Sequence, residues 1–151
     1  MDAMDAKRVL VVFEPGRGGA AVLELACELA ERQGATLTIV SVAPQGVSGA
    51  RCGNSALDYN LALQDSAAED LDHARAWLGE FGASASYELL IERASPSLEE
   101  FAADGRFDLV LLPARRRPLR EPGHPAAERL QLTTGAEIQV IAPRPKQRTH
   151  T

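Results

Sequence analysis

The sequence has few of the residues that most often carry out chemistry. It contains two cysteines, three histidines and one tryptophan in 151 residues. Cys27 and Cys52 lie too far apart in sequence to indicate a disulfide framework or a metal site. Cys27 falls on the apolar stripe of an expected helix, which favours a small core residue. Cys52 lies in a Gly-rich loop, where it is either an ordinary loop residue or an exposed, reactive thiol.

Long hydrophobic runs and an excess of basic charge are also missing. No stretch is long enough to span a membrane, and the apolar run near the N-terminus is too short for a signal peptide. We therefore expect a cytoplasmic protein without a membrane partner. The net charge is -5, which argues against general attraction to nucleic acid. The segment 115–120, with four arginines, is a local exception.

Hydrophobic residues make up 45% of the chain and charged residues 25%, as in ordinary globular proteins. We expect one domain over residues 8–144, with flexible termini at 1–7 and 145–151. Apolar runs predict strands at 9–13, 36–42, 84–92, 107–112 and 137–142. Helical spacing predicts helices from Ala20 to Gly34, from Ser55 to Gly82, from a Ser95 cap with Pro96 in the first turn, and from Ala126.

This alternation predicts an α/β fold, a doubly wound five-stranded parallel sheet of order 3-2-1-4-5 with helices on both faces. In that order the topological switch point lies between the first and fourth strands, and ligands bind beyond the carboxyl ends of strands at such points. The candidate binding residues at this position are Glu14, Gly16, Val42, Pro113, Arg115 and Arg116.

The segment 113–125 is expected to be a loop, and it leaves two interpretations open. Arg115, Arg116, Arg117 and Arg120 could bind a phosphate or an acidic partner, or they could form a solvated basic loop, which is the simpler interpretation. His124 could act as an acid or base. No carboxylate or nucleophile pairs with it in the sequence, so an ordinary loop residue is favoured. We find no metal-binding spacing and no catalytic triad pattern.

Several short segments, taken in order, resemble the universal stress protein family from Arg8 to Arg144. An apolar strand followed by Glu14-Pro15-Gly16 stands where the family has Asp-Gly-Ser. Asp108 and its apolar run precede Pro113-Ala114-Arg115-Arg116, where the family has Gly-Ser-Arg-Gly. Ala127-Glu128-Arg129-Leu130 matches the family's fourth helix, and Ile138-Gln139-Val140-Ile141 its last strand. The resemblance implies the fold called adenine nucleotide alpha hydrolase-like.

Members of the family that bind ATP carry G-x2-G-x9-G-[ST] between the fourth strand and helix, because backbone amides must close around phosphates. Here Arg116 and Leu119 stand in place of the first two glycines. His124-Pro125 stands in place of Gly-Ser, and proline has no amide hydrogen to donate. The resemblance therefore implies a degenerate member that has no cofactor and does not bind ATP tightly.

The favoured function is a dimeric regulatory or stress-response module that is not an enzyme. The alternative is a nucleotide- or phosphate-binding protein that uses the 115–120 segment at the switch point. A hydrolase or transferase on this fold is the third possibility. The resemblance also implies a homodimer through the strand at 138–142, an edge without proline or lysine, and a further protein partner remains possible.

Overall fold

The computed structural model describes residues 7–14, 19–44, 55–117 and 120–142. For residues 55–60, 81, 83, 116–117 and 120–122 it describes the backbone but not the side chains. Gly16, Cys52 and Leu119 lie outside the described residues. So do the expected flexible termini at 1–7 and 145–151, except for Lys7.

Five parallel strands form the central sheet, in the order β3-β2-β1-β4-β7. This order is the predicted one, with β7 as the fifth strand of the sheet. The strands are β1 (Arg8–Val12), β2 (Thr36–Ala43), β3 (Ser86–Ile91), β4 (Leu109–Pro113) and β7 (Glu137–Ile141). The apolar runs of β1 and β4 lie at the centre of the sheet and pair in parallel from Val9 with Leu109. Their complete burial explains why both sequences are continuous rather than alternating.

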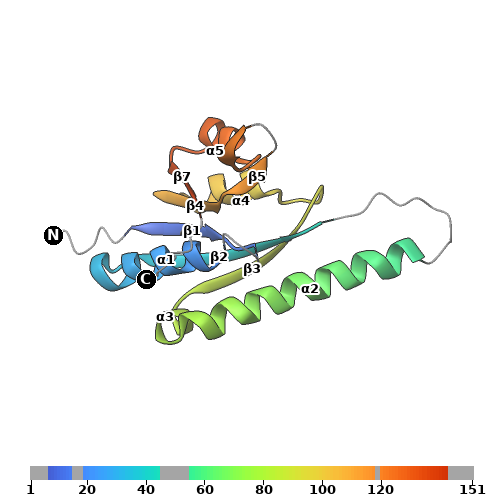
Figure 1. Ribbon diagram of the computed structural model, residues 1–151, viewed down its shortest axis with the longest axis horizontal. Coiled ribbons are helices and arrows are strands. Elements are labelled where there is room, and N and C mark those ends of the chain that lie inside the picture. The colour runs from blue at the N-terminus through green and yellow to red at the C-terminus, as the bar shows by residue number, and fades with distance from the viewer. Residues whose placement is uncertain (1–6, 15–18, 45–54, 118–119, 143–151) are drawn as a thin grey trace, which may run out of the picture.

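Helices cover both faces of the sheet, as predicted (Figure 1). On one face α1 (Gly19–Gln33), α2 (Ser55–Leu78) and the short α3 (Glu80–Ala83) pack against the sheet, and on the other α4 (Leu98–Gly105) and α5 (Ala127–Thr133) do so. Side chains of β1 alternate between two cores. Val9 and Val11 join the α1 and α2 side, whereas Leu10 and Val12 join the α4 and α5 side.

The segment after β4 is more ordered than the predicted loop. Pro113 is buried inside β4, where it pairs with Ile141. The chain then forms a small antiparallel sheet from β5 (Arg115–Arg117) and β6 (Arg120–Gly123), with Arg115 opposite Gly123. Pairing between β5 and β6 lets the two strands satisfy part of each other's backbone hydrogen-bonding groups.

Two helix boundaries differ from the prediction. The long helix ends at Leu78 rather than at Gly82, because Gly79 adopts a positive φ of 63°, which favours glycine and cannot continue the helix. The helix predicted to begin at Ser95-Pro96 instead begins after Ser97. The Ser97 side chain accepts from the Glu100 amide, and the Glu100 carboxylate accepts from the Ser97 amide, which forms a capping box. The Ser97-x-x-Glu100 pattern was visible in the sequence.

Candidate functional site

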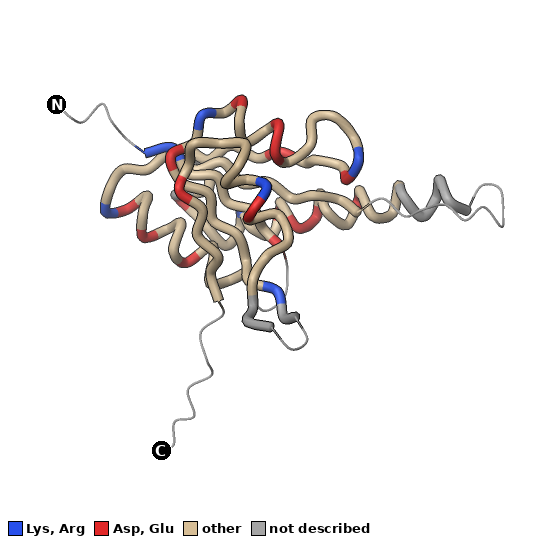
Figure 2. Tube along the Cα trace, turned by 90° about the horizontal axis from the view of Figure 1, so that it is seen from above, with Lys and Arg blue, Asp and Glu red and all other residues tan. Residues whose placement is uncertain are grey.

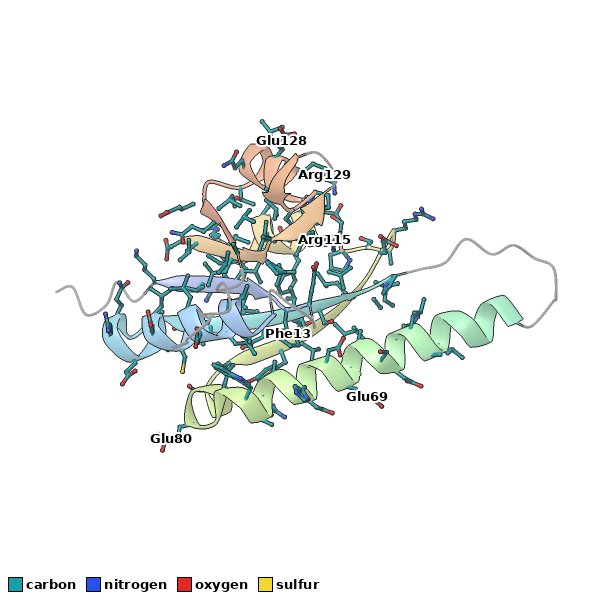
Figure 3. The ribbon with its side chains drawn as sticks, in the orientation of Figure 1. Phe13, Glu69, Glu80, Arg115, Glu128 and Arg129 are labelled. Carbon is teal, nitrogen blue, oxygen red and sulfur yellow. The ribbon has the colours of Figure 1, made fainter. Side chains whose placement is uncertain are left out.

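A cleft of about 470 Å³ lies at the carboxyl ends of the central strands. It is therefore at the predicted switch point between β1 and β4. Figure 3 labels Phe13, Arg115 and Arg129 around this end of the sheet. The residues that line the cleft are Val12, Glu14, Val42, Ile91, Glu92, Arg93, Ser97, Leu98, Glu99, Arg115, His124, Pro125, Ala126 and Arg129.

Three of the six predicted site residues meet in this cleft. Glu14, Val42 and Arg115 line it. Pro113 does not belong to its lining, because its ring is buried within β4. Gly16 and the Arg116 side chain lie outside the described residues.

Glu14 forms the centre of the site, just after β1. The Arg115 guanidinium makes a bidentate contact with its carboxylate: Nε donates to Oε1 at 3.0 Å and Nη2 donates to Oε2 at 2.6 Å. Arg115 is thus paired with Glu14 rather than free. The side chain of Glu14 is 29% exposed and that of Arg115 is 50% exposed, so the pair lies at the mouth of the cleft.

His124 is the site residue whose partner the sequence did not reveal. Its ring is buried, with a side-chain exposure of 5%, and Nε2 lies 2.8 Å from the Glu14 Oε2 atom. The ring nitrogen on the other side, Nδ1, accepts a hydrogen bond from the Ala126 amide at 3.1 Å. Because Nδ1 is an acceptor, the proton of the neutral ring lies on Nε2 and is donated to Glu14. The prediction of an unpaired loop histidine was therefore wrong.

These contacts change the acidity of Glu14. Burial by itself raises the pKa of the carboxyl, but the hydrogen bonds from His124 and Arg115 outweigh burial and lower the pKa to about 2. The pKa of Arg115 is raised in turn, chiefly by its hydrogen bonds to Glu14. Both partners therefore stay charged at neutral pH.

A second ion pair closes the α4 and α5 side of the cleft. Arg129 Nε donates to Glu99 Oε2 at 2.7 Å, which joins the two helices. Burial raises the pKa of Glu99, but the hydrogen bond from Arg129 and the other contacts lower it overall. The capping box of Ser97 and Glu100 occupies amides at the start of α4. Acidic and basic residues are interspersed over the rest of the trace (Figure 2).

A second cavity of about 340 Å³ adjoins the first on the α2 side. Glu14, Val42, Glu92 and Arg115 line both cavities, so the Glu14–Arg115 pair stands between them. No group of three or more His, Cys, Asp or Glu side chains that could hold a metal ion occurs in the part of the chain that the structure describes. In that same part, no helix combines the length and the apolar character needed to cross a bilayer.

The family model described as the universal stress protein family matches residues 6–137. The chain belongs to the universal stress protein family. This confirms the resemblance read from the sequence, and structures of the family share the predicted fold. No curated protein matches the sequence significantly.

Solved structures of universal stress proteins share the fold of this chain. One from Lactobacillus plantarum is 17% identical with a TM-score of 0.73, and the match covers 89% of this chain and 97% of that one. One from Burkholderia pseudomallei is 20% identical with a TM-score of 0.65 and covers 91% and 96%. One from Archaeoglobus fulgidus, solved in complex with dAMP, is 19% identical with a TM-score of 0.58 and covers 90% and 97%.

Proposed function

We propose that this universal stress protein is a dimeric regulatory module whose cleft does not hold ATP. The observation that carries the proposal is the structure between β4 and α5. The β5–β6 hairpin stands where ATP-binding members have their glycine loop. At its end Pro125 has no amide hydrogen, and the Ala126 amide is already bound by His124.

A tightly bound triphosphate needs several free backbone amides close together. In this chain Pro125, just before α5, has no amide hydrogen, and the Ala126 amide already donates to the His124 ring. A phosphate could use the Ala126 amide only by displacing the buried His124 ring, which would break the hydrogen bonds of both ring nitrogens and remove one of the three donors to the Glu14 carboxylate. That cost opposes binding.

The cleft supports a binding function better than a catalytic one. Both ring nitrogens of His124 are occupied, one by Glu14 and one by Ala126, so neither is free to take a proton from a substrate. Glu14 is held ionised by two donors and is a poor general base because its pKa is about 2. We therefore propose that the protein is not an enzyme.

The dimer is proposed from the position of β7 at the edge of the sheet. Ile138 and Val140 of this strand pack against one core, and Ile141 packs against the other. All side chains from Ile138 to Ile141 nevertheless remain only half-buried. An apolar edge strand with incomplete cover is suited to pairing with the same strand of a second copy across a two-fold axis. A cytoplasmic location and a further protein partner remain predictions.

The alternative function is nucleotide or phosphate binding through the segment 115–120. The size and position of the cleft favour it, since 470 Å³ is within the range of small-molecule sites. The solved relative bound to dAMP also supports it. The pairing of Arg115 argues against this alternative. Phosphate binding would need a free Arg115 guanidinium, but Glu14 already binds it in a bidentate contact.

Calorimetric titration of the protein with Mg-ATP tests the proposed function. We expect no binding in the micromolar range and no nucleotide released when the freshly purified protein is denatured and chromatographed. Micromolar binding that is lost when residues 113–120 are altered would support the alternative function instead.

A further inference from the structure

The Glu14 carboxylate occupies Arg115 in the way that a ligand anion would. Its two oxygens accept from Nε and Nη2 at 3.0 and 2.6 Å, the parallel geometry that arginine also uses for phosphate. One of these oxygens accepts a further hydrogen bond from His124 at 2.8 Å. An anion supplied by the chain itself thus satisfies three donor groups.

Arg115 is the cation that a ligand in either cavity would meet, because it lines both of them. Of the other arginines on the larger cavity, Arg129 is paired with Glu99, and Arg93 lies at an exposed position beyond β3. Arg115 lies two residues after the end of β4, at the switch point. The state of Arg115 therefore affects how strongly this end of the sheet attracts anions.

His124 holds the carboxylate in place. Its ring is buried and is oriented from behind by the Ala126 amide, so Nε2 points at Glu14 with little freedom to turn. The pKa of Glu14, lowered to about 2, keeps the carboxylate ionised at every physiological pH. The negative charge beside Arg115 is consequently permanent.

We propose that Glu14 is a built-in anion that determines the specificity of the cleft: it neutralises Arg115 and excludes ligands that carry phosphate. The inference rests on the proposed function, since it names the residue that keeps phosphates out. It also predicts that the cleft becomes a phosphate site when this one charge is removed.

Titration with inorganic pyrophosphate tests the inference. Glu69→Gln is the control for Glu14→Gln, because it changes the net charge by the same amount at an exposed position of α2. The wild-type protein should bind pyrophosphate no better than this control. Glu14→Gln should bind pyrophosphate at least about tenfold more tightly than either, because a charge-assisted hydrogen bond is gained and a repulsion is lost. The double variant Glu14→Gln with Arg115→Gln should lose that gain.

Circular dichroism checks that each variant is folded. A second test of the inference uses the wild-type protein alone. In nuclear magnetic resonance spectra of wild-type protein, the Arg115 Nε–H signal should not move when pyrophosphate is added. A shift of this signal, or a folded Glu14→Gln that binds no better than Glu69→Gln, would overturn the inference. Tight binding of Mg-ATP by the wild type would refute both the proposed function and the inference, whereas either of these two results would overturn the inference alone.

Discussion

His124 shows at the scale of one residue how the site is held together. The buried ring bridges the Glu14 carboxylate and the Ala126 amide. His124→Ala should therefore lower the free energy of unfolding by about 1–3 kcal/mol, since it leaves the Ala126 amide without its acceptor and removes one of the three donors to the Glu14 carboxylate. His124→Asn should cost less, because an asparagine oxygen can accept from the amide two residues on.

Urea unfolding followed by circular dichroism measures these changes. His73→Ala is the matched control, because His73 is exposed on α2, and it should change stability by less than about 0.5 kcal/mol. Equal stability of His124→Ala and the control would show that the bridge contributes nothing.

The low pKa of Glu14 makes stability depend on pH at the same scale. The pKa is about 2 in the folded protein and 4.5 for a free glutamate, so the folded state favours the ionised form. This stabilisation is complete above pH 4.5 and is lost as the pH falls from 4.5 to about 2. It amounts to about 2 kcal/mol once solvent screening at the half-exposed Arg115 is allowed for.

Urea unfolding of the wild type and of Glu14→Gln over this range provides the measurement. The wild type should be the more stable near neutral pH, and the gap should narrow as the carboxylate is protonated. A gap that stays constant from neutral pH down to about pH 3 would contradict this assignment of the charge.

At the scale of an element, the start of α1 constrains the site through Gly19. A Cβ atom at this position would lie 2.5 Å from the Glu14 carbonyl oxygen and 3.0 Å from the Phe13 Cε1 atom. Gly19→Ala should therefore push the end of β1 away from α1. We expect a loss of about 1–3 kcal/mol, the usual cost of forcing extra atoms into packed structure.

Gly135→Ala is the control for this substitution, because no atom lies within 4 Å of its Cβ position. Thermal unfolding should give nearly the same midpoint for this variant as for the wild type. The same midpoint in Gly19→Ala would mean that α1 and β1 can separate without cost.

At the scale of the whole molecule, the dimer prediction concerns the free edge of the sheet. Val140→Pro should convert the proposed dimer to monomers, because proline removes an amide from β7 and stiffens the strand. Light scattering after size-exclusion chromatography measures the mass of both proteins. Because β7 also pairs with β4, circular dichroism must show that the variant is folded.

A wild-type monomer at micromolar concentration would refute the dimer. A folded Val140→Pro that remains dimeric would place the interface on another surface. The opposite edge strand, β3, would then be the next surface to test.

The sequence by itself determined the strands of the central sheet, their order and the location of the cleft. Continuous apolar runs depend on burial of both strand faces, so β1 and β4 could be assigned to the centre without coordinates. Strand order then brought the ends of β1 and β4 together, which is why Glu14 and Arg115 were both predicted at one site. Short motifs in the same order were enough to indicate the family, which the match over residues 6–137 confirms.

Only the tertiary structure decided where the long helix ends, because Gly79 and Gly82 are both able to end a helix. Gly79 ends α2 because it adopts a positive φ, whereas Gly82 packs against the Arg75 carbonyl and the Tyr87 hydroxyl. The start of α4 is different, because the pattern Ser97-x-x-Glu100 of its capping box was already present in the sequence.

The pairing of side chains within the site was also decided by the tertiary structure. Glu14 and His124 are 110 residues apart, and Glu14 and Arg115 are 101 apart. Contacts at such separation leave no periodic pattern in the sequence, because they depend on how β1, the β5–β6 hairpin and the start of α5 converge. The sequence could therefore name the residues at the cleft, but only the fold could show that Glu14 binds both His124 and Arg115.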